Sequence, residues 1–213
     1  MSRHQPLTPS LLLNAYAHGI FPMSTSRRGG QILWFAPDPR AVIEFSEWRP
    51  GRHLRRLMRN HPFELRVNGD FRATMEGCAG PRSRESDTWI SPELIDAYCQ
   101  LHAAGFAHSV EAWRDGQMVG GLYMVQVGAA LMGESMFSRE TNASKVCLIY
   151  LMQRMSERGF TLLDTQFITG HLTRFGAVEI SRTDYQRRLA EALAADPPPS
   201  FVGEPMVVPP PKP

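Results

Sequence analysis

Cysteine is scarce in this chain of 213 residues, and long apolar runs are absent. The three cysteines (Cys78, Cys99 and Cys147) lack C-x-x-C spacing, and their odd number argues against a disulfide framework. No apolar run approaches the ~20 residues that a membrane helix needs. Residues 1–14 lack the charged-then-apolar order of a secretory signal. We therefore expect a cytoplasmic protein with no metal site and no membrane contact.

Lysine is also nearly missing. Lys145 and Lys212 are the only lysines among 23 basic residues, which leaves 21 arginines, yet the net charge is only +2. Arginine binds phosphate through a planar fork of donors that lysine does not have. A coding bias towards GC-rich codons explains the number of arginines by itself, so the informative feature is where they lie.

Four arginines are predicted to share one face of a helix within residues 49–59. They fall at i, i+3, i+4 and i+7, and three apolar residues on the other side allow the helix to dock on a core. A solvated charged face is the simpler interpretation, but acidic partners at i±4 are missing. We therefore expect a surface that binds the phosphate backbone of a nucleic acid, formed by Arg52, Arg55, Arg56 and Arg59.

Composition divides the chain into three parts. Residues 1–40 are expected to form a short N-terminal unit that buries little surface alone. Residues 41–195 carry the main domain, since 43% hydrophobic residues suffice for a core. Eight of the 17 prolines follow Asp196, which predicts a disordered, polyproline-type tail over residues 196–213.

The order of elements predicts an α+β fold. A helix at 91–104 precedes a three-stranded meander with a turn at Asp115-Gly116, and a long helix, a strand and a last helix follow. The expected ranges are 8–18 for a first helix and 107–114, 118–127 and 129–137 for the meander. The long helix is expected at 143–158, the next strand at 160–167 and the last helix at 181–195.

This order is similar to the GCN5-related acyltransferase fold (GNAT/FemABX-like), here with a curtailed N-terminal α/β unit. Acetyl-CoA-dependent members place glycines before the long helix, because glycine lets the backbone approach the pyrophosphate. The corresponding stretch, Ser138–Ser144, contains no glycine. An acyl donor without CoA, and no cofactor, is therefore favoured, and an acyl-CoA-dependent N-acyltransferase is kept as an alternative.

Candidate site residues gather where the meander ends and the long helix begins. Glu134 lies at the end of an apolar run, and Asn142 and Ser144 are candidate helix caps. Asp164 and Gln166 are two residues apart on a strand, so they are expected to share one face. Taken alone, this region is better explained as a capped helix behind a strand.

Eight short motifs, in register, give the sequence a specific resemblance. The chain is similar to the leucyl/phenylalanyl-tRNA-protein transferases, bacterial enzymes of the N-degron pathway. The motifs are Ala15–Pro22, Trp34–Arg40, Thr88–Ile90, His108–Glu111, Gly120–Tyr123, Gly133–Ser138, Asn142–Lys145, and Leu163–Gln166 with His171.

The resemblance implies transfer of Leu, Phe or Met from aminoacyl-tRNA to the α-amino group of proteins that begin with Arg or Lys, which marks them for degradation. No covalent enzyme intermediate is needed, and a monomer is expected. The implied catalytic residues are Asp164 and Gln166, with Glu134 helping to hold the substrates. The implied substrate-binding residues are Tyr16, Met23, Arg40 and Trp89 around the terminal adenosine, Ser135, and Leu122, Leu148 and Leu151 around the transferred side chain.

The chain also departs from the family pattern. About 30 residues that commonly precede the first helix are absent, and Met23 stands where a tryptophan is usual. Methionine fills space but stacks poorly on a base. A tRNA-binding module that has lost catalysis is therefore a further alternative.

Overall fold

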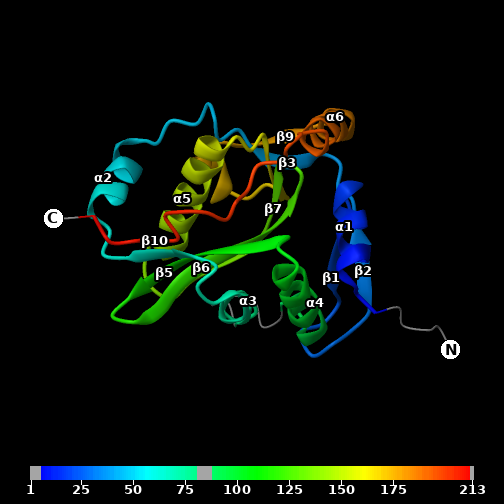
Figure 1. Ribbon diagram of the computed structural model, residues 1–213, viewed down its shortest axis with the longest axis horizontal. Helices are drawn as coiled ribbons and strands as arrows, with labels where there is room; N and C mark the ends of the chain where they lie inside the picture. Colours follow the sequence, from blue (N-terminus) through cyan, green and yellow to red (C-terminus); the bar gives the residue numbers. More distant parts are fainter. Residues whose placement is uncertain (1–5, 81–87, 212–213) are drawn as a thin grey trace.

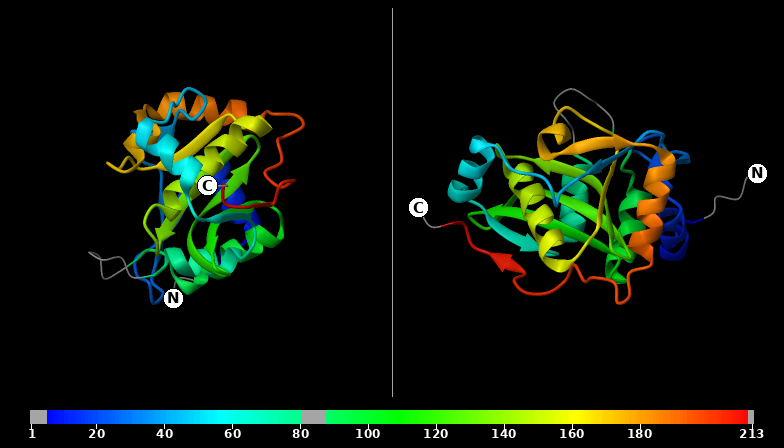
Figure 2. Two further views of the ribbon diagram at one scale, coloured as in Figure 1. Left: turned by 90° about the vertical axis from the view of Figure 1, so that its left-hand side faces the viewer. Right: turned by 90° about the horizontal axis from the view of Figure 1, so that it is seen from above.

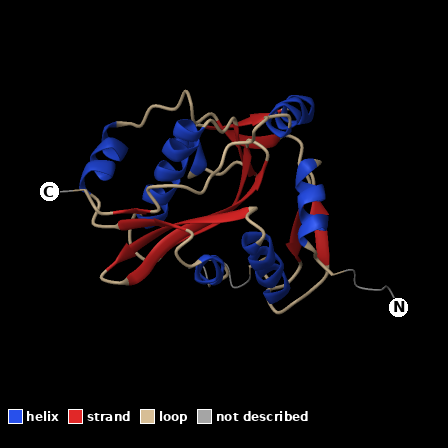
Figure 3. Ribbon diagram, viewed as in Figure 1, coloured by secondary structure: helices blue, strands red, loops and turns tan. Residues whose placement is uncertain are grey.

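An eight-stranded mixed sheet runs through the computed structural model, which describes residues 6–80 and 88–211 (Figures 1 and 3). The predicted α+β class is confirmed. The strand order is β10-β4-β5-β6-β7-β8-β3-β9. The bounds are β3 Arg40–Ile43, β4 Glu64–Val67, β5 Ala107–Arg114, β6 Gln117–Val127, β7 Ala130–Ser138, β8 Leu162–Gln166, β9 Ala177–Ile180 and β10 Val207–Val208.

The predicted meander is confirmed as β5, β6 and β7. Asp115 and Gly116 both have positive φ, +50° and +74°, which is the conformation that a tight hairpin turn requires. Side chains along β6 alternate between two cores, with Leu122 and Met124 on one face and Tyr123 on the other. This period of two fixes the register of the central strands.

The predicted long helix is confirmed as α5, Ala143–Arg158. It connects β7 to β8, which form the only parallel pair among the described strands. A Cβ atom added at Gly120 on β6 would lie 2.5 Å from the Cβ of Ala143, so glycine permits the start of α5 to sit directly on the sheet. Figure 1 shows α5 on one side of β5 and β6, with α3 and α4 on the other.

Four helices contribute to the core opposite α5. Each begins at a residue whose side chain caps a free backbone N–H group. They are α1 Pro9–Ala17, α3 Phe71–Cys78, α4 Pro92–Ala103 and α6 Arg182–Leu193, capped by Thr8, Asp70, Ser91 and Ser181. No helix within the described ranges is both long and apolar enough to span a bilayer.

The N-terminal segment contains α1 and a hairpin of β1, Phe21–Ser24, and β2, Ile32–Phe35. Tyr16 of α1 is fully buried and contacts Tyr98 of α4 edge-on. The division at residue 40 stays a prediction, and residues 1–5 lie outside the described ranges.

The C-terminal segment differs from the sequence prediction of a disordered tail. Up to residue 211 it runs back along the protein, and its strand β10 pairs with β4 (Figure 2). The Phe201 side chain is fully buried and packs edge-on against Phe160, with ring centroids 6.2 Å apart. Residues 212 and 213 lie outside the described ranges.

Two arginines of α5 explain why this proline-rich segment is held. Arg154 donates hydrogen bonds to the carbonyl oxygens of Phe201 (2.9 Å), Gly203 and Pro205 (3.0 Å). Arg158 donates to three further carbonyls, those of Ser200, Val202 and Glu204. Proline lacks a backbone N–H but keeps its carbonyl acceptor, so guanidinium donors satisfy a backbone that cannot form a full ladder.

Replacing the buried aromatic residue should reveal the contribution of this segment to stability. We expect Phe201→Ala to lower the free energy of unfolding by about 3–5 kcal/mol, because a large cavity would remain. The control is Val202→Ala, since Val202 is 45% exposed and should change stability by less than about 0.5 kcal/mol. Equal urea midpoints for the two variants would contradict this assignment.

Candidate active site

A pocket of about 340 Å³ opens where β6, β7 and β8 meet α5, and it is called the central pocket here. Its lining combines a leucine-rich wall with a few polar groups. The lining residues are Trp89, Leu122, Tyr123, Gly133, Glu134, Ser135, Met136, Leu148, Leu151, Leu163, Thr165, Gln166, Phe167, Thr169, His171 and Leu172. Seven predicted site residues therefore come together: Glu134, Gln166, Trp89, Ser135, Leu122, Leu148 and Leu151.

A β-bulge places Glu134 in this pocket. Tyr123 pairs with Ser135 and Met124 pairs with Gly133, so Glu134 is an extra residue in β7 without a partner on β6. A bulge breaks the in–out alternation and re-aims the side chain. The Gln166 side-chain amide donates a hydrogen bond of 3.0 Å to Glu134 Oε1.

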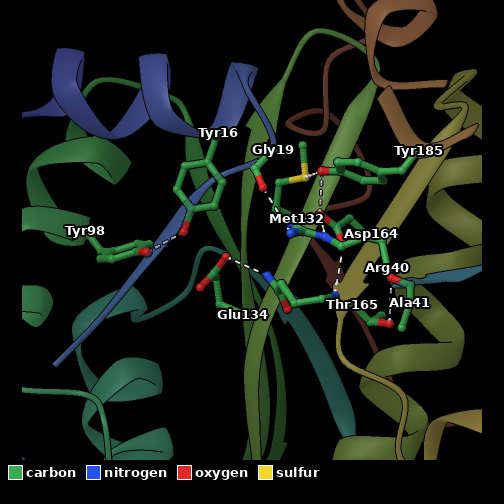
Figure 4. A network of polar contacts seen from close by, with 11 residues as sticks. Tyr16, Gly19, Arg40, Ala41, Tyr98, Met132, Glu134, Asp164, Thr165 and Tyr185 are labelled. Atoms are coloured by element: carbon green, nitrogen blue, oxygen red, sulfur yellow. Dashed lines mark hydrogen bonds and ion pairs between the residues drawn. The ribbon is translucent and has the colours of Figure 1, made fainter. Parts of the chain in front are cut away.

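The surroundings of Glu134 are unusual for a carboxylate. Its removal from water, helped by the nearby charge of Asp164, raises the pKa of Glu134 to about 8, while contacts with Tyr16 and Arg40 oppose the rise. The hydroxyls of Tyr16 and Tyr98 form a hydrogen bond with each other beside it (Figure 4). Burial raises the pKa of both phenols well above the ordinary value, so they remain neutral.

Asp164 has a different environment. Its two oxygens accept hydrogen bonds from Arg40 Nε at 2.9 Å and Nη2 at 2.6 Å, and from the Tyr185 hydroxyl at 2.8 Å. Asp164 is fully buried and Arg40 is 1% exposed. The Arg40 guanidinium also donates to the Gly19 carbonyl at 3.0 Å and lies over the rings of Phe21 and Tyr185. Figure 4 shows Arg40 and Tyr185 converging on this carboxylate.

Gln166 adopts a backbone conformation that is rare outside glycine, with φ of +59°. Its backbone N–H donates to Asp164 Oδ1 at 2.8 Å, which holds the turn. A register shift in the pairing of β3 with β8 leaves Thr165 as the extra residue there. Such strain costs on the order of 1–3 kcal/mol and is often found at functional sites.

Asp164 and Gln166 were predicted to point from one face of the strand into the same site, and the structure differs from this prediction. Asp164 contacts the backbone of Gln166 and does not line the central pocket, whereas the Gln166 side chain contacts Glu134. The left-handed turn at Gln166 breaks the alternation on which the prediction depended.

Three residues expected around an adenosine lie outside the pocket lining. Arg40 and Tyr16 are buried, at 1% and 0% exposure, and each is used in an internal hydrogen bond. Met23 is half-buried and packs against the core that contains Tyr16.

Several site residues were missed from the sequence. Tyr185 and Tyr98 contact the two carboxylate environments from α6 and α4, and no local pattern marks them. Phe167 and Thr169 line the pocket because the chain turns at Gln166. His171, which belongs to a family motif and was expected to be structural, also lines it, and its Nε2 has no hydrogen-bond partner among the described residues.

The start of α5 is not capped as expected. Asn142 has φ of +71° and makes no capping hydrogen bond, and its side-chain oxygen instead accepts from Lys145 Nζ at 2.7 Å. The cap comes from Ser138, whose hydroxyl accepts from the Ser144 N–H at 3.2 Å.

The predicted arginine-bearing helix is confirmed as α2, Arg52–Asn60. All four arginines on it are exposed. Within residues 6–80 and 88–211, Arg52, Arg55, Arg56 and Arg59 form no ion pair, so their positive charge is not neutralised there.

Comparisons with known proteins agree on one family. A family model described as leucyl/phenylalanyl-tRNA protein transferase matches residues 42–190, and a model of that family's N-terminal domain matches residues 5–38. Proteins called leucyl/phenylalanyl-tRNA–protein transferase are similar in Paramagnetospirillum magneticum (47% identity, covering 89% of this chain and 91% of that protein) and Herpetosiphon aurantiacus (51% identity, covering 88% and 95%).

Among solved structures, L-PGS from Bacillus licheniformis is a distant match. Its TM-score is 0.41 at 13% sequence identity, and the match covers 72% of this chain and 51% of that one. A likeness this weak assigns neither a fold nor a function.

Removing one partner of the buried ion pair should be costly. We expect Asp164→Asn to lower the free energy of unfolding by about 3–5 kcal/mol, because the Arg40 charge would be left buried and uncompensated. Asp96→Asn is the matched control, since its pair with Arg72 is exposed and is worth about 0–1 kcal/mol. Similar losses in urea denaturation for both variants would argue against the pair as a structural centre.

The pKa of Glu134 also predicts a pH dependence of stability. The folded protein holds this proton more tightly than the unfolded chain, so the stabilising contribution is complete below pH 4.5 and is lost as the pH rises through 8. We expect the stability of the wild type, relative to Glu134→Gln, to fall between pH 5 and pH 8 by up to ~1.4 kcal/mol per pH unit. A constant difference over this range in urea titrations would refute the raised pKa.

Proposed function

The chain belongs to the leucyl/phenylalanyl-tRNA-protein transferase family, and on this basis we propose that it moves Leu, Phe or Met from aminoacyl-tRNA to the α-amino group of proteins beginning with Arg or Lys. The observation that carries the proposal is a leucine-walled pocket with Glu134 at a raised pKa beside it. Marking of the acceptor for degradation, a monomeric state and a cytoplasmic location are parts of the same proposal.

The apolar wall supports selection of the transferred amino acid. Leu122, Leu148 and Leu151 line the central pocket and are almost fully buried. An apolar pocket discriminates one methylene by only about 1–3 kcal/mol. Several unbranched, branched and aromatic side chains are therefore accepted, and charged ones are excluded by the cost of desolvation.

The reaction is aminolysis of an ester. The acceptor nitrogen attacks the carbonyl carbon of the aminoacyl ester, a C–N bond forms, and the bond from that carbon to the ribose oxygen breaks. The amine loses a proton and the departing ribose oxygen gains one, so the reaction needs no covalent enzyme intermediate and no cofactor. The protein has to orient the reactants and move this proton.

Glu134 is suited to take up the proton. An α-amino group has an ordinary pKa of about 7.7–8.0, and burial raises the pKa of Glu134 into the same range, to about 8, so a proton can pass between them near neutral pH. Gln166 orients the carboxylate through its 3.0 Å hydrogen bond. Asp164 acts as a positioning residue, because it holds the backbone of Gln166 and its oxygens are already used.

The remaining parts of the proposal concern fold and RNA binding. The parallel β7–α5–β8 unit beside an antiparallel meander supports a GCN5-related (GNAT/FemABX-like) core over residues 41–195 with a short N-terminal unit over residues 1–40. The unpaired arginines of α2 support contact with the tRNA phosphate backbone.

Incubation with leucyl-tRNA and peptides beginning with Arg, Lys or Asp tests the activity. We expect products with the Arg and Lys peptides only, and no acetylated product when acetyl-CoA replaces the tRNA. Glu134→Gln and Gln166→Ala should slow transfer about 10²- to 10⁴-fold, the range for loss of proton-transfer catalysis.

Glu140→Gln is the matched control, because Glu140 lies on the surface in a pair with Arg114. It should keep the wild-type rate. Binding of tRNA without any turnover would identify a non-catalytic module, and acetylation of the peptide would identify an acyl-CoA enzyme; either result overturns the proposal.

A further inference from the structure

A second hollow of about 480 Å³ lies between α2 and α5, and it is called the α2–α5 groove here. Its floor is apolar, with Met58, Ile149 and Met152 among its lining residues. Three arginines, Arg49, Arg55 and Arg59, and one indole, Trp48, line it as well. None of these residues takes part in the central pocket.

The indole of Trp48 is rigidly held. It stacks on Phe175, with ring centroids 5.9 Å apart and planes inclined by 27°, and its Nε1 donates to the Arg174 carbonyl at 3.2 Å. A fixed aromatic ring at the wall of a hollow binds a planar partner with little further loss of conformational freedom.

The charge of the groove favours an anion. Arg49, Arg55 and Arg59 are exposed, and none of them forms an ion pair within the described parts of the chain. Glu157 is the one acidic residue in the lining. An aromatic platform beside arginines is the combination that binds single-stranded nucleic acid, through base stacking and phosphate contacts.

The groove is connected to the central pocket through packed rings. Trp48 stacks on Phe175, and Phe175 contacts His171 at a centroid distance of 5.1 Å. His171 lines the central pocket. Helix α5 contributes to both hollows, with Leu148 and Leu151 facing one and Ile149 and Met152 facing the other.

The outer side of α2 offers a comparison within the same helix. The hollow there is lined by Arg52, His53, Arg56, Arg59 and Asn60, without an indole or an apolar floor. Its composition suits phosphate contacts alone. The two sides of α2 therefore differ in what they present to a base, although both carry arginine.

We propose that the α2–α5 groove binds a nucleotide from the single-stranded 3′ end of aminoacyl-tRNA, with the base against Trp48 and its phosphate on Arg55. This inference rests on the proposed function, since it requires an RNA substrate whose end reaches the central pocket. Nucleotides preceding the terminal adenosine are unpaired and flexible, so a stacking platform near that pocket would order the strand before reaction.

The test compares two RNA ligands, an acceptor-stem minihelix with a four-nucleotide single-stranded 3′ end and the same minihelix with a blunt end. Binding is measured by fluorescence anisotropy over a range of salt concentrations. We expect Trp48→Leu to weaken binding of the single-stranded form about 5- to 100-fold, the range for loss of one stacked base, without changing the salt slope. Trp48→Phe should restore most of the affinity, and the blunt form should bind all three proteins equally.

Arg55→Gln and Arg56→Gln form the matched pair. Both should reduce the salt slope by about one. Only Arg55→Gln should also reduce the preference for the single-stranded form, because Arg56 lies outside the groove.

Three outcomes would overturn the groove assignment: no effect of Trp48→Leu, equal loss for both RNA forms, or tight competition by free AMP, which would identify a mononucleotide site. Trp48→Phe is the folding control: restored RNA binding and an unchanged urea midpoint would show that Trp48→Leu does not lose affinity through misfolding. The two proposals can fail separately. If the protein transfers amino acids and the Trp48 and Arg55 variants bind RNA like the wild type, only the groove assignment is wrong. If RNA binding depends on the groove but no amino acid is transferred, only the proposed transferase activity is wrong.

Discussion

The buried ion pair between Arg40 and Asp164 is the interaction on which the site depends. Taking two charges out of water costs several kcal/mol per ion, and the cost is offset only where geometry and further hydrogen bonds are good. Here the pair joins the start of β3 to β8, while Tyr185 approaches from α6 and the Gly19 carbonyl from the N-terminal segment. One contact therefore fixes how four parts of the chain meet.

Two carboxylates within the same site have opposite surroundings. The oxygens of Asp164 accept hydrogen bonds from Arg40 and Tyr185, whereas Glu134 lines the central pocket beside a tyrosine pair and the Gln166 amide. Gln166 connects them, because its backbone belongs to the first environment and its side chain to the second. The strained positive φ of Gln166 allows its backbone to contact Asp164 while its side chain contacts Glu134.

Sequence patterns were sufficient for elements with strong local signals. The predicted turn at Asp115-Gly116 and the predicted helices at 91–104 and 143–158 agree with the structure, in which Ser91 caps α4 and Gly159 ends α5. The four-residue strands β3, β4 and β9 were not predicted, because such short strands form through pairing with residues that are distant in the sequence. The bulge at Glu134, the left-handed turn at Gln166 and the neighbours of Arg40 are likewise tertiary properties, and periodicity does not report them.

The short strand β10 gives the sheet a protected edge. Without it, β4 would present unpaired backbone groups to other molecules, which invites strand addition and aggregation. Strand β10 is only two residues long, and the three prolines that follow it have no N–H groups to offer a further strand. Truncation of the chain at residue 196 would therefore leave the edge of β4 unpaired and favour self-association.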